Sequence, residues 1–399
     1  MDGTLEAPRT WHARRMLGVA TLGYLLSAWA WALLAPLAPL LRDTLGLTPI
    51  QQALVVSLPV VVGSLARFPV GALSDRLGSR TTFLLVVVAT LVVLLVLATV
   101  VDRSAASLLT GAALLGVAGT MFAVAVPFVS AEFAGPRRGL ALGLLGTGLC
   151  GGALGGLTTV RLVDAYGLAA PFLAAATAVT LFGLIVALTV RDDAGRAPAR
   201  AKRTGTPAAA LRLPITWRGS LWNAVTSALF VTFSSYLPVY LTTAYGLGLE
   251  RTGHAMAGII AVAVLMRPVG GWLADRLAPR RPLAVSLTVL TGAVAVQACT
   301  PPLPVVAVVV PVLGVALGIA SGAILAHVAR EAPPEIIGGV SGVVTGIAGL
   351  AGFASPLLMA ASLSRFGGYG PALAILAAAP AVAAVGVLRE ASRAGAGRT

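Results

Sequence analysis

The sequence predicts an all-α membrane protein whose twelve transmembrane helices form two similar six-helix bundles. Three observations predict this fold: an apolar composition, long apolar runs that recur along the chain, and a second half that repeats the first. Of the 399 residues, 58% are hydrophobic and 11% are charged, whereas a soluble domain carries about 25% charged residues. The mean hydropathy of +0.94 reflects the whole length of the chain, so a single anchor helix does not account for it.

The apolar runs are long enough to cross a bilayer, which takes about 20 residues for a hydrocarbon core of about 30 Å. With breaks at Gly, Pro and charged residues, the first half contains six runs, near residues 16–41, 51–73, 81–101, 106–132, 138–160 and 168–190. The second half contains six more, near residues 219–244, 252–274, 281–299, 303–329, 336–363 and 370–388. The predicted domains are therefore an N-terminal bundle (1–190), a basic linker (191–218) and a C-terminal bundle with a short tail (219–399).

The basic residues gather on one side of the predicted membrane. Of the 28 Lys and Arg residues, 21 lie on the side of the N-terminus and five on the opposite side. The positive-inside rule then places both termini and the linker in the cytoplasm. The net charge of +14 is explained in this way without a nucleic-acid partner, and we expect a multi-pass protein of the cytoplasmic membrane.

The internal repeat has an offset of 200 residues. Near the second predicted helix, it pairs Arg67, Gly71, Leu73, Asp75, Arg76, Leu77 and Arg80 with Arg267, Gly271, Leu273, Asp275, Arg276, Leu277 and Arg280. Far downstream, the same offset pairs Gly139, Gly146 and Gly152 with Gly339, Gly346 and Gly352. Two distant stretches agree on one offset, which indicates a duplicated six-helix unit with parallel repeats.

The paired loop segments carry a family resemblance. Gly71-Ala-Leu-Ser-Asp75-Arg-Leu-Gly-Ser-Arg80 and its second copy, Gly271-Trp-Leu-Ala-Asp275-Arg-Leu-Ala-Pro-Arg280, resemble the loop signature of the major facilitator superfamily. In that superfamily the motif stabilises one conformation of the alternating-access cycle. The resemblance implies the superfamily's fold and a gating role for Gly71, Asp75, Arg76, Arg80, Gly271, Asp275, Arg276 and Arg280.

Two arginines, Arg67 and Arg267, lie deep inside predicted helices. Arg67 precedes Asp75 by eight residues, which places it about 12 Å into the membrane, close to the midplane of the hydrocarbon core. A charge at this depth costs at least about 2.5 kcal/mol and must face protein or a water-filled cavity. Since none of the 14 acidic residues falls in the centre of a predicted helix, an anionic substrate is the expected counter-ion. A guanidinium suits planar oxyanions because its donors form a fork. The alternative is that both arginines snorkel to the cytoplasm or donate to helix carbonyls.

Glycines are dense in the fifth and eleventh predicted helices, at spacings of three and four residues. Such spacing allows neighbouring backbones to approach closely, and it also leaves room for a small ligand at a cavity wall. Gly146 and Gly349 are the candidates for that second role. In the first helix, Trp29 and Trp31 either line a central cavity or face lipid.

Four segments resemble the nitrate/nitrite porter family. They are Ala66-Arg67-Phe-Pro-Val-Gly71, Leu265-Met-Arg267-Pro-Val-Gly-Gly271, Gly116-Val-Ala-Gly119-Thr-Met-Phe122-Ala with Pro136-Arg-Arg-Gly-Leu-Ala-Leu-Gly143, and Gly342-Val-Val-Thr-Gly346-Ile-Ala-Gly349-Leu-Ala-Gly352-Phe-Ala-Ser-Pro356. The resemblance implies that Arg67 and Arg267 bind one nitrate or nitrite between the halves, with Phe122 in the wall of the site.

The chain departs from that family at three positions. Where members usually have an asparagine among the glycines of helix 5, this chain has Leu149 or Cys150, and the Gly-Asn-Gly of helix 10 reads Ala320-Ser321-Gly322. Asn223 stands where some members place a tyrosine. Asn223 and Ser321 are able to hydrogen-bond an oxyanion, and we include both in the predicted site. The departures leave the identity of the anion open.

The predicted function is alternating-access transport of a small oxyanion, with nitrate and nitrite first. The alternatives are a transporter of organic anions or drugs, and a membrane sensor that binds the anion without transporting it. Without a midplane carboxylate, anion exchange is favoured over proton coupling through a buried Asp or Glu. We expect no enzymatic activity, no cofactor and no metal, because the sequence has neither a phosphate loop nor a metal-ligand spacing. We also expect a monomer.

Overall fold

A computed structural model describes residues 6–133, 138–190, 210–277, 280–332 and 337–396, and all regular structure in these residues is helical. The first half contains α1 (Glu6–Ala32), α2 (Leu34–Leu45), α3 (Pro49–Leu77), α4 (Ser79–Val100), α5 (Ala105–Leu115), the 3-10 turn η1 (Gly116–Thr120), α6 (Met121–Glu132), α7 (Arg138–Gly146), the 3-10 turn η3 (Thr147–Cys150), α8 (Gly151–Tyr166) and α9 (Ala170–Thr189). The second half contains α12 (Pro214–Phe233), α13 (Leu237–Tyr245), α14 (Leu249–Leu277), α15 (Arg280–Ala298), α16 (Leu303–Glu331), α17 (Ile337–Phe366) and α18 (Gly370–Ala396).

The predicted helical spans are present. Within the described residues, eleven helical segments are long and apolar enough to cross a membrane, and α12 with α13 forms a twelfth span that is bent by 52°. The sequence did not predict this bend inside the run 219–244. It falls at Ser234–Tyr236, where the Ser234 hydroxyl bonds to the Phe230 carbonyl and Pro238 lies in the first turn of α13. A serine that competes for backbone carbonyls and a proline without an N–H both interrupt a helix.

Two further spans are interrupted by 3-10 turns at glycines. The fourth span changes from α5 to α6 through η1, and the fifth changes from α7 to α8 through η3. Gly116, which begins η1, lies against α3 so closely that a Cβ would come within 2.8 Å of the Gly63 nitrogen. The turns thus lie where helices of the same half touch backbone to backbone.

The 200-residue repeat is visible in the helix boundaries. The structure places α3 at residues 49–77 and α14 at residues 249–277, so both arginine helices begin and end at equivalent positions. At the start of α3, Thr48 and Gln51 form a capping box and Pro49 occupies the first turn, a combination that fixes a helix N-terminus. Arg67 and Arg267 therefore lie at the same height in their two bundles.

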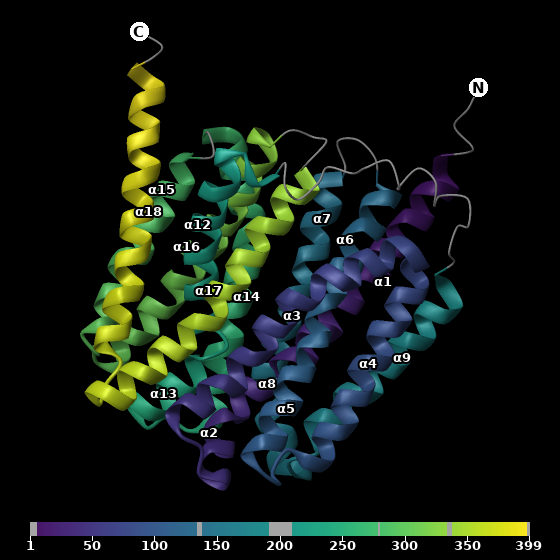
Figure 1. The fold of residues 1–399 in the computed structure, drawn as a ribbon, viewed down its shortest axis with the longest axis vertical. Helices are drawn as coiled ribbons and strands as arrows, with labels where there is room; N and C mark the ends of the chain where they lie inside the picture. The colour runs from purple at the N-terminus through teal and green to yellow at the C-terminus, as the bar shows by residue number, and fades with distance from the viewer. Residues whose placement is uncertain (1–5, 134–137, 191–209, 278–279, 333–336, 397–399) are drawn as a thin grey trace.

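The two bundles lie side by side and touch mainly where α3 packs against α17 and α8 packs against α14. Further contacts join α2 to α13 and α14, and join α14 to α7 and η3. The start of α1 and the end of α18 lie at one end of the molecule, and α2 and α13 lie at the opposite end (Figure 1). Small residues allow the contact between halves. A Cβ on Gly349 of α17 would collide with Ser64 of α3, and a Cβ on Gly156 of α8 would collide with the Gly253 carbonyl of α14.

The exact domain boundaries remain a prediction. Residues 191–209, most of the predicted linker, lie outside the described residues. The described chain resumes at Ala210, and α12 starts at Pro214, a few residues before the predicted start of the C-terminal bundle.

Candidate functional site

A cavity of about 230 Å³ lies between the two halves, and both midplane arginines line it. Each contributing helix presents one face, because its lining residues recur at spacings of three and four. The faces are Tyr24, Ala28 and Trp31 of α1; Val60, Ser64 and Arg67 of α3; Ala263 and Arg267 of α14; and Leu317, Ser321 and Leu325 of α16. The site is thus assembled from both repeats.

Arg67 is anchored to the backbone of its own half. Its Nε donates to the carbonyl oxygen of Gly119 at 3.0 Å, and Gly119 belongs to the turn η1. A 3-10 turn shifts the helical hydrogen-bond pattern from i−4 to i−3, so η1 is a place where a side chain can reach a backbone carbonyl. One donor of Arg67 therefore bonds to a helix carbonyl, as the alternative to anion binding predicted. The side chain nevertheless lines the cavity.

Arg267 is held differently. Its Nε is buried and has no hydrogen-bond partner among the described residues. Its guanidinium carbon lies 5.8 Å from the centre of the Phe230 ring, within the range of a cation–π interaction. A buried N–H without an acceptor is costly. The Arg267 side chain is therefore suited to bind a ligand that supplies a hydrogen-bond acceptor.

No described Asp or Glu side chain forms an ion pair with either arginine. The ion pairs of the described residues involve Glu250 and Glu331, which lie at opposite ends of the second half. The cavity is therefore positively charged, and electrostatics favours an anion inside it. No cluster of His, Cys, Asp or Glu able to hold a metal occurs among the described residues.

The structure brings six of the seven predicted substrate-binding residues to this cavity: Arg67, Phe122, Asn223, Arg267, Ser321 and Gly349. Phe122 stacks on Tyr24 with ring centres 4.9 Å apart and planes at 42°. The Asn223 side-chain amide donates to the Val344 carbonyl at 3.4 Å. The seventh, Gly146, is not among the residues that line the cavity.

The fifth span (α7, η3 and α8) contributes an apolar side chain at the place where the resemblance to the nitrate/nitrite porters implies an asparagine. Leu149 lines the cavity, and Cys150 lies beside it in η3, half-buried. The wall formed by the fifth span therefore offers the anion no side-chain hydrogen bond at Leu149.

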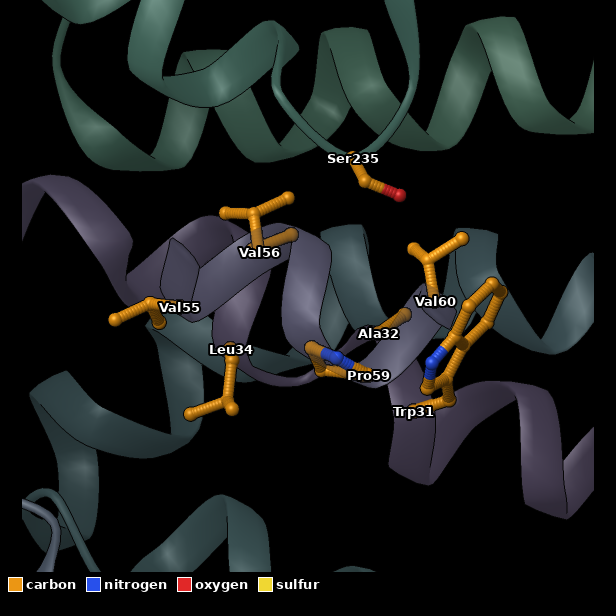
Figure 2. Close-up of a pocket in the computed structure, with 9 residues that line it drawn as sticks. Trp31, Ala32, Leu34, Val55, Val56, Pro59, Val60 and Ser235 are labelled. Carbon is orange, nitrogen blue, oxygen red and sulfur yellow. The ribbon is translucent and has the colours of Figure 1, made fainter. Parts of the chain in front are cut away.

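The cavity is bounded toward the end where α2 and α13 lie. Trp31 and Val60 belong both to the cavity wall and to a second pocket of about 10 Å³. Figure 2 shows this pocket between α2, α3 and Ser235, with apolar side chains around it. Its volume is about that of one water site, so the two halves are almost in contact there. Trp29, by contrast, donates its indole N–H to Thr158 at 3.1 Å.

The predicted gating motif is partly described. Arg80 donates to the Ala187 carbonyl at 2.8 Å, and its counterpart Arg280 pairs with Glu331 at 3.2 Å. Arg276 lies over the Trp272 ring at 4.4 Å. The side chains of Asp75, Arg76 and Asp275 lie outside the described part of the structure, and a Cβ on Gly71 or Gly271 would meet nothing within 4 Å. The gating role remains a prediction.

The sequence missed several wall residues, above all Tyr24, together with Ser64, Thr226, Ser227 and Phe230. A signal for some of them was present. Ser64 lies three residues before Arg67, on the same helix face, and Tyr24 shares a face with Trp31. The periodicity alone did not say which face of the first helix points inward, because α1 is apolar around most of its circumference.

Comparison with known proteins agrees with the fold. Residues 20–356 match the model of the Major Facilitator Superfamily. A Mycobacterium tuberculosis protein named "Probable nitrate/nitrite transporter NarK2" is 37% identical over 349 residues, which cover 87% of this chain and 88% of the relative. A Thermus thermophilus protein named "Probable nitrate/nitrite antiporter NarK1" is 30% identical over 380 residues, covering 87% and 84%.

Solved structures show the same fold at low sequence identity. A bacterial homologue of the human lysosomal transporter Spinster, in an inward-facing and occupied conformation, superposes with a TM-score of 0.74 at 17% identity, covering 95% of this chain and 97% of that one. The repeat, the arginine helices and the close relatives lead to one conclusion. The chain belongs to the nitrate/nitrite porter family of the Major Facilitator Superfamily, a family of membrane transporters and not of enzymes.

Proposed function

We propose that this protein is a secondary active transporter of small inorganic oxyanions, with nitrate and nitrite as its substrates. The observation that carries the proposal is the pair Arg67 and Arg267 in one cavity between the halves, without an acidic partner among the described residues. Two guanidiniums offer planar, fork-shaped donor sets that match the oxygens of a planar oxyanion. The names of the relatives in Mycobacterium tuberculosis and Thermus thermophilus support the same substrates.

Transport would proceed by rocking of the two bundles around the central site. In this proposal the bundles comprise residues 1–190 and 219–399, joined by the linker 191–218, and the transporter works as a monomer. The excess of Lys and Arg on one side supports cytoplasmic termini in the cytoplasmic membrane. The gating residues Asp75, Arg76, Asp275 and Arg276 would stabilise one of the two conformations.

The proposed coupling is anion exchange. A transporter that carried its proton on a buried carboxylate would need an Asp or Glu near the anion, and none of the described side chains that line the cavity is acidic. An exchanger needs no proton carrier, because a second anion takes the place of the first beside the two arginines when the halves move back. Occupation by one or the other anion would then be a condition for movement.

The test is uptake of labelled nitrate into proteoliposomes that contain the purified protein, with nitrite inside or without it. We expect fast uptake with internal nitrite and little uptake without it. Equal uptake in both conditions would contradict exchange but not nitrate transport. The absence of nitrate flux in both conditions, together with flux of an organic anion, would contradict the proposed substrate.

A transporter of organic anions is the second candidate, and the cavity itself favours it. Its volume of about 230 Å³ is large compared with the about 10–15 Å³ that suffices for one water, and Leu149, Leu317 and Leu325 form apolar parts of the wall. Benzoate in the same uptake experiment separates the candidates, because a site built for nitrate would transport nitrate in preference to the larger carboxylate.

A further inference from the structure

We propose that the Tyr24 hydroxyl is a third donor to the transported anion, in the same cavity as the two arginines and decisive for affinity. The inference rests on the proposed function, because it assigns a further ligand to the same anion site. Three features of Tyr24 point to this role: its position in the cavity wall, the packing that fixes its ring, and its free hydroxyl.

Tyr24 lines the same cavity as both arginines. It lines the cavity from α1, and it lies within electrostatic range of both Arg67 and Arg267. An anion that contacts both guanidiniums is therefore also near the phenol. The neutral O–H adds a donor without adding charge, and a hydrogen bond to an anion is stronger than one between neutral groups.

The ring of Tyr24 is fixed from two sides. Phe122 stacks against it at 4.9 Å, and Gly148 of η3 lies at its base. A Cβ on Gly148 would come within 2.9 Å of both the Cβ and the Cδ1 of Tyr24, so only glycine leaves room for this ring. The turn in the fifth span thus helps to hold Tyr24 in the cavity wall. A donor held in place before binding loses little entropy when the ligand arrives.

The Tyr24 hydroxyl takes part in none of the hydrogen bonds of the described residues, and Tyr24 lines the cavity, whereas several other polar groups of the wall are engaged. The Asn223 amide donates to Val344, and the Thr226 hydroxyl donates to Trp222 at 3.1 Å. These donors are engaged by backbone carbonyls, whereas the phenol remains available. A planar anion with three oxygens can then meet two guanidinium forks and one hydroxyl.

The experiment is calorimetric titration of the purified full-length protein with sodium nitrate, sodium nitrite and sodium benzoate at constant ionic strength. Tyr24→Phe keeps the ring stacked on Phe122 and removes only the oxygen. We expect it to weaken binding of the preferred anion by about tenfold, the factor for one hydrogen bond to a charged group. The control is Tyr166→Phe, at an exposed position at the end of α8, which should leave the Kd unchanged.

Every outcome decides the inference. A Kd within twofold of the unmodified protein would overturn it, and so would a marked fall in Tm, because that would show that the protein itself uses the hydroxyl. If the protein binds benzoate but not nitrate or nitrite, the proposed substrate is wrong. The role of Tyr24 is then tested by the change in the Kd for benzoate, and a change within twofold overturns it. If none of the three anions binds, both proposals are overturned.

Discussion

Arg67 and Arg267 occupy equivalent positions in the two repeats, yet the two halves hold them differently. Arg67 donates from Nε to the Gly119 carbonyl at 3.0 Å. In the second half, the position equivalent to Gly119 is Ile319, inside the uninterrupted helix α16, and the Nε of Arg267 has no partner there. Phe230 lies next to Arg267 instead.

The difference suggests that the two arginines have different roles in binding the anion. The first half has a 3-10 turn at the level of its arginine, and this turn fixes the side chain before any ligand arrives. The second half has a continuous helix at the same level, so all the donors of Arg267 remain available. Duplication supplied two guanidiniums at one height, and later divergence would have made one a fixed support and the other a ligand-dependent clamp.

The largest expected effect comes from changing the two arginines separately to lysine. Arg267→Lys should raise the Kd for nitrate by about 100-fold, because it removes a two-donor contact and each hydrogen bond to a charged group contributes about 1.5–3 kcal/mol. Arg67→Lys should raise the Kd by only about tenfold, since one of its donors already serves Gly119. Calorimetric titration with nitrate measures both, and Arg103→Lys, in an exposed loop, is the control.

Two results would refute this comparison. Equal losses in the two variants would mean that the Gly119 anchor has no influence on how the arginines bind. A variant with unchanged affinity and full transport would remove its arginine from the bidentate role altogether.

The sequence predicted the helical spans, the repeat and the arginine pair, because these depend on composition and spacing along one chain. Arg67 and Arg267 were identified from the repeat, from their depth and from the lack of midplane acids, and the family resemblance assigned them to one anion. Hydropathy did not reveal η1 or the bend at Ser234–Tyr236, because both interrupt runs that stay apolar.

The remaining parts of the site depend on contacts between distant segments. Gly116 reaches Gly63 across 53 positions of sequence, and Gly148 makes room for Tyr24. No periodicity within a single helix contains that information. The proposed role of Tyr24 therefore had to come from the structure, and so did the position of Gly146 outside the cavity wall.

A second comparison concerns Leu149 and Gly349, which are also equivalent under the 200-residue offset. Both line the cavity, but Gly349 additionally allows α17 to touch α3 at Ser64. Gly349→Ala should force the helices apart, at the cost of about 1–3 kcal/mol that overpacking usually brings. We expect nitrate exchange in proteoliposomes to slow by about tenfold.

The control for this variant lies on the same helix. A Cβ on Gly342 would meet nothing within 4 Å, so Gly342→Ala should exchange nitrate at the normal rate while changing helix propensity by the same amount. If both variants slowed equally, helix flexibility and not the contact with Ser64 would limit transport.

The smallest effect is expected where α8 meets α14. Arg161 of the first half donates from Nε and Nη2 to Glu250 of the second half, each at 3.2 Å, and also contacts His254 at 3.2 Å. Because the Arg161 and Glu250 side chains are 61% and 57% exposed, their ion pair contributes at most about 0.2–1 kcal/mol to closure. Glu250→Gln should therefore increase the population of molecules opened at this end by only about two- to fivefold, as measured by spin-label distances between α8 and α14.

The control is Asp164→Asn, on α8 without a described ion pair, which should leave the distances unchanged. High salt should reproduce the Glu250→Gln result in the unmodified protein; insensitivity to both would mean that the glycine contact between Gly156 and Gly253 closes this end unaided.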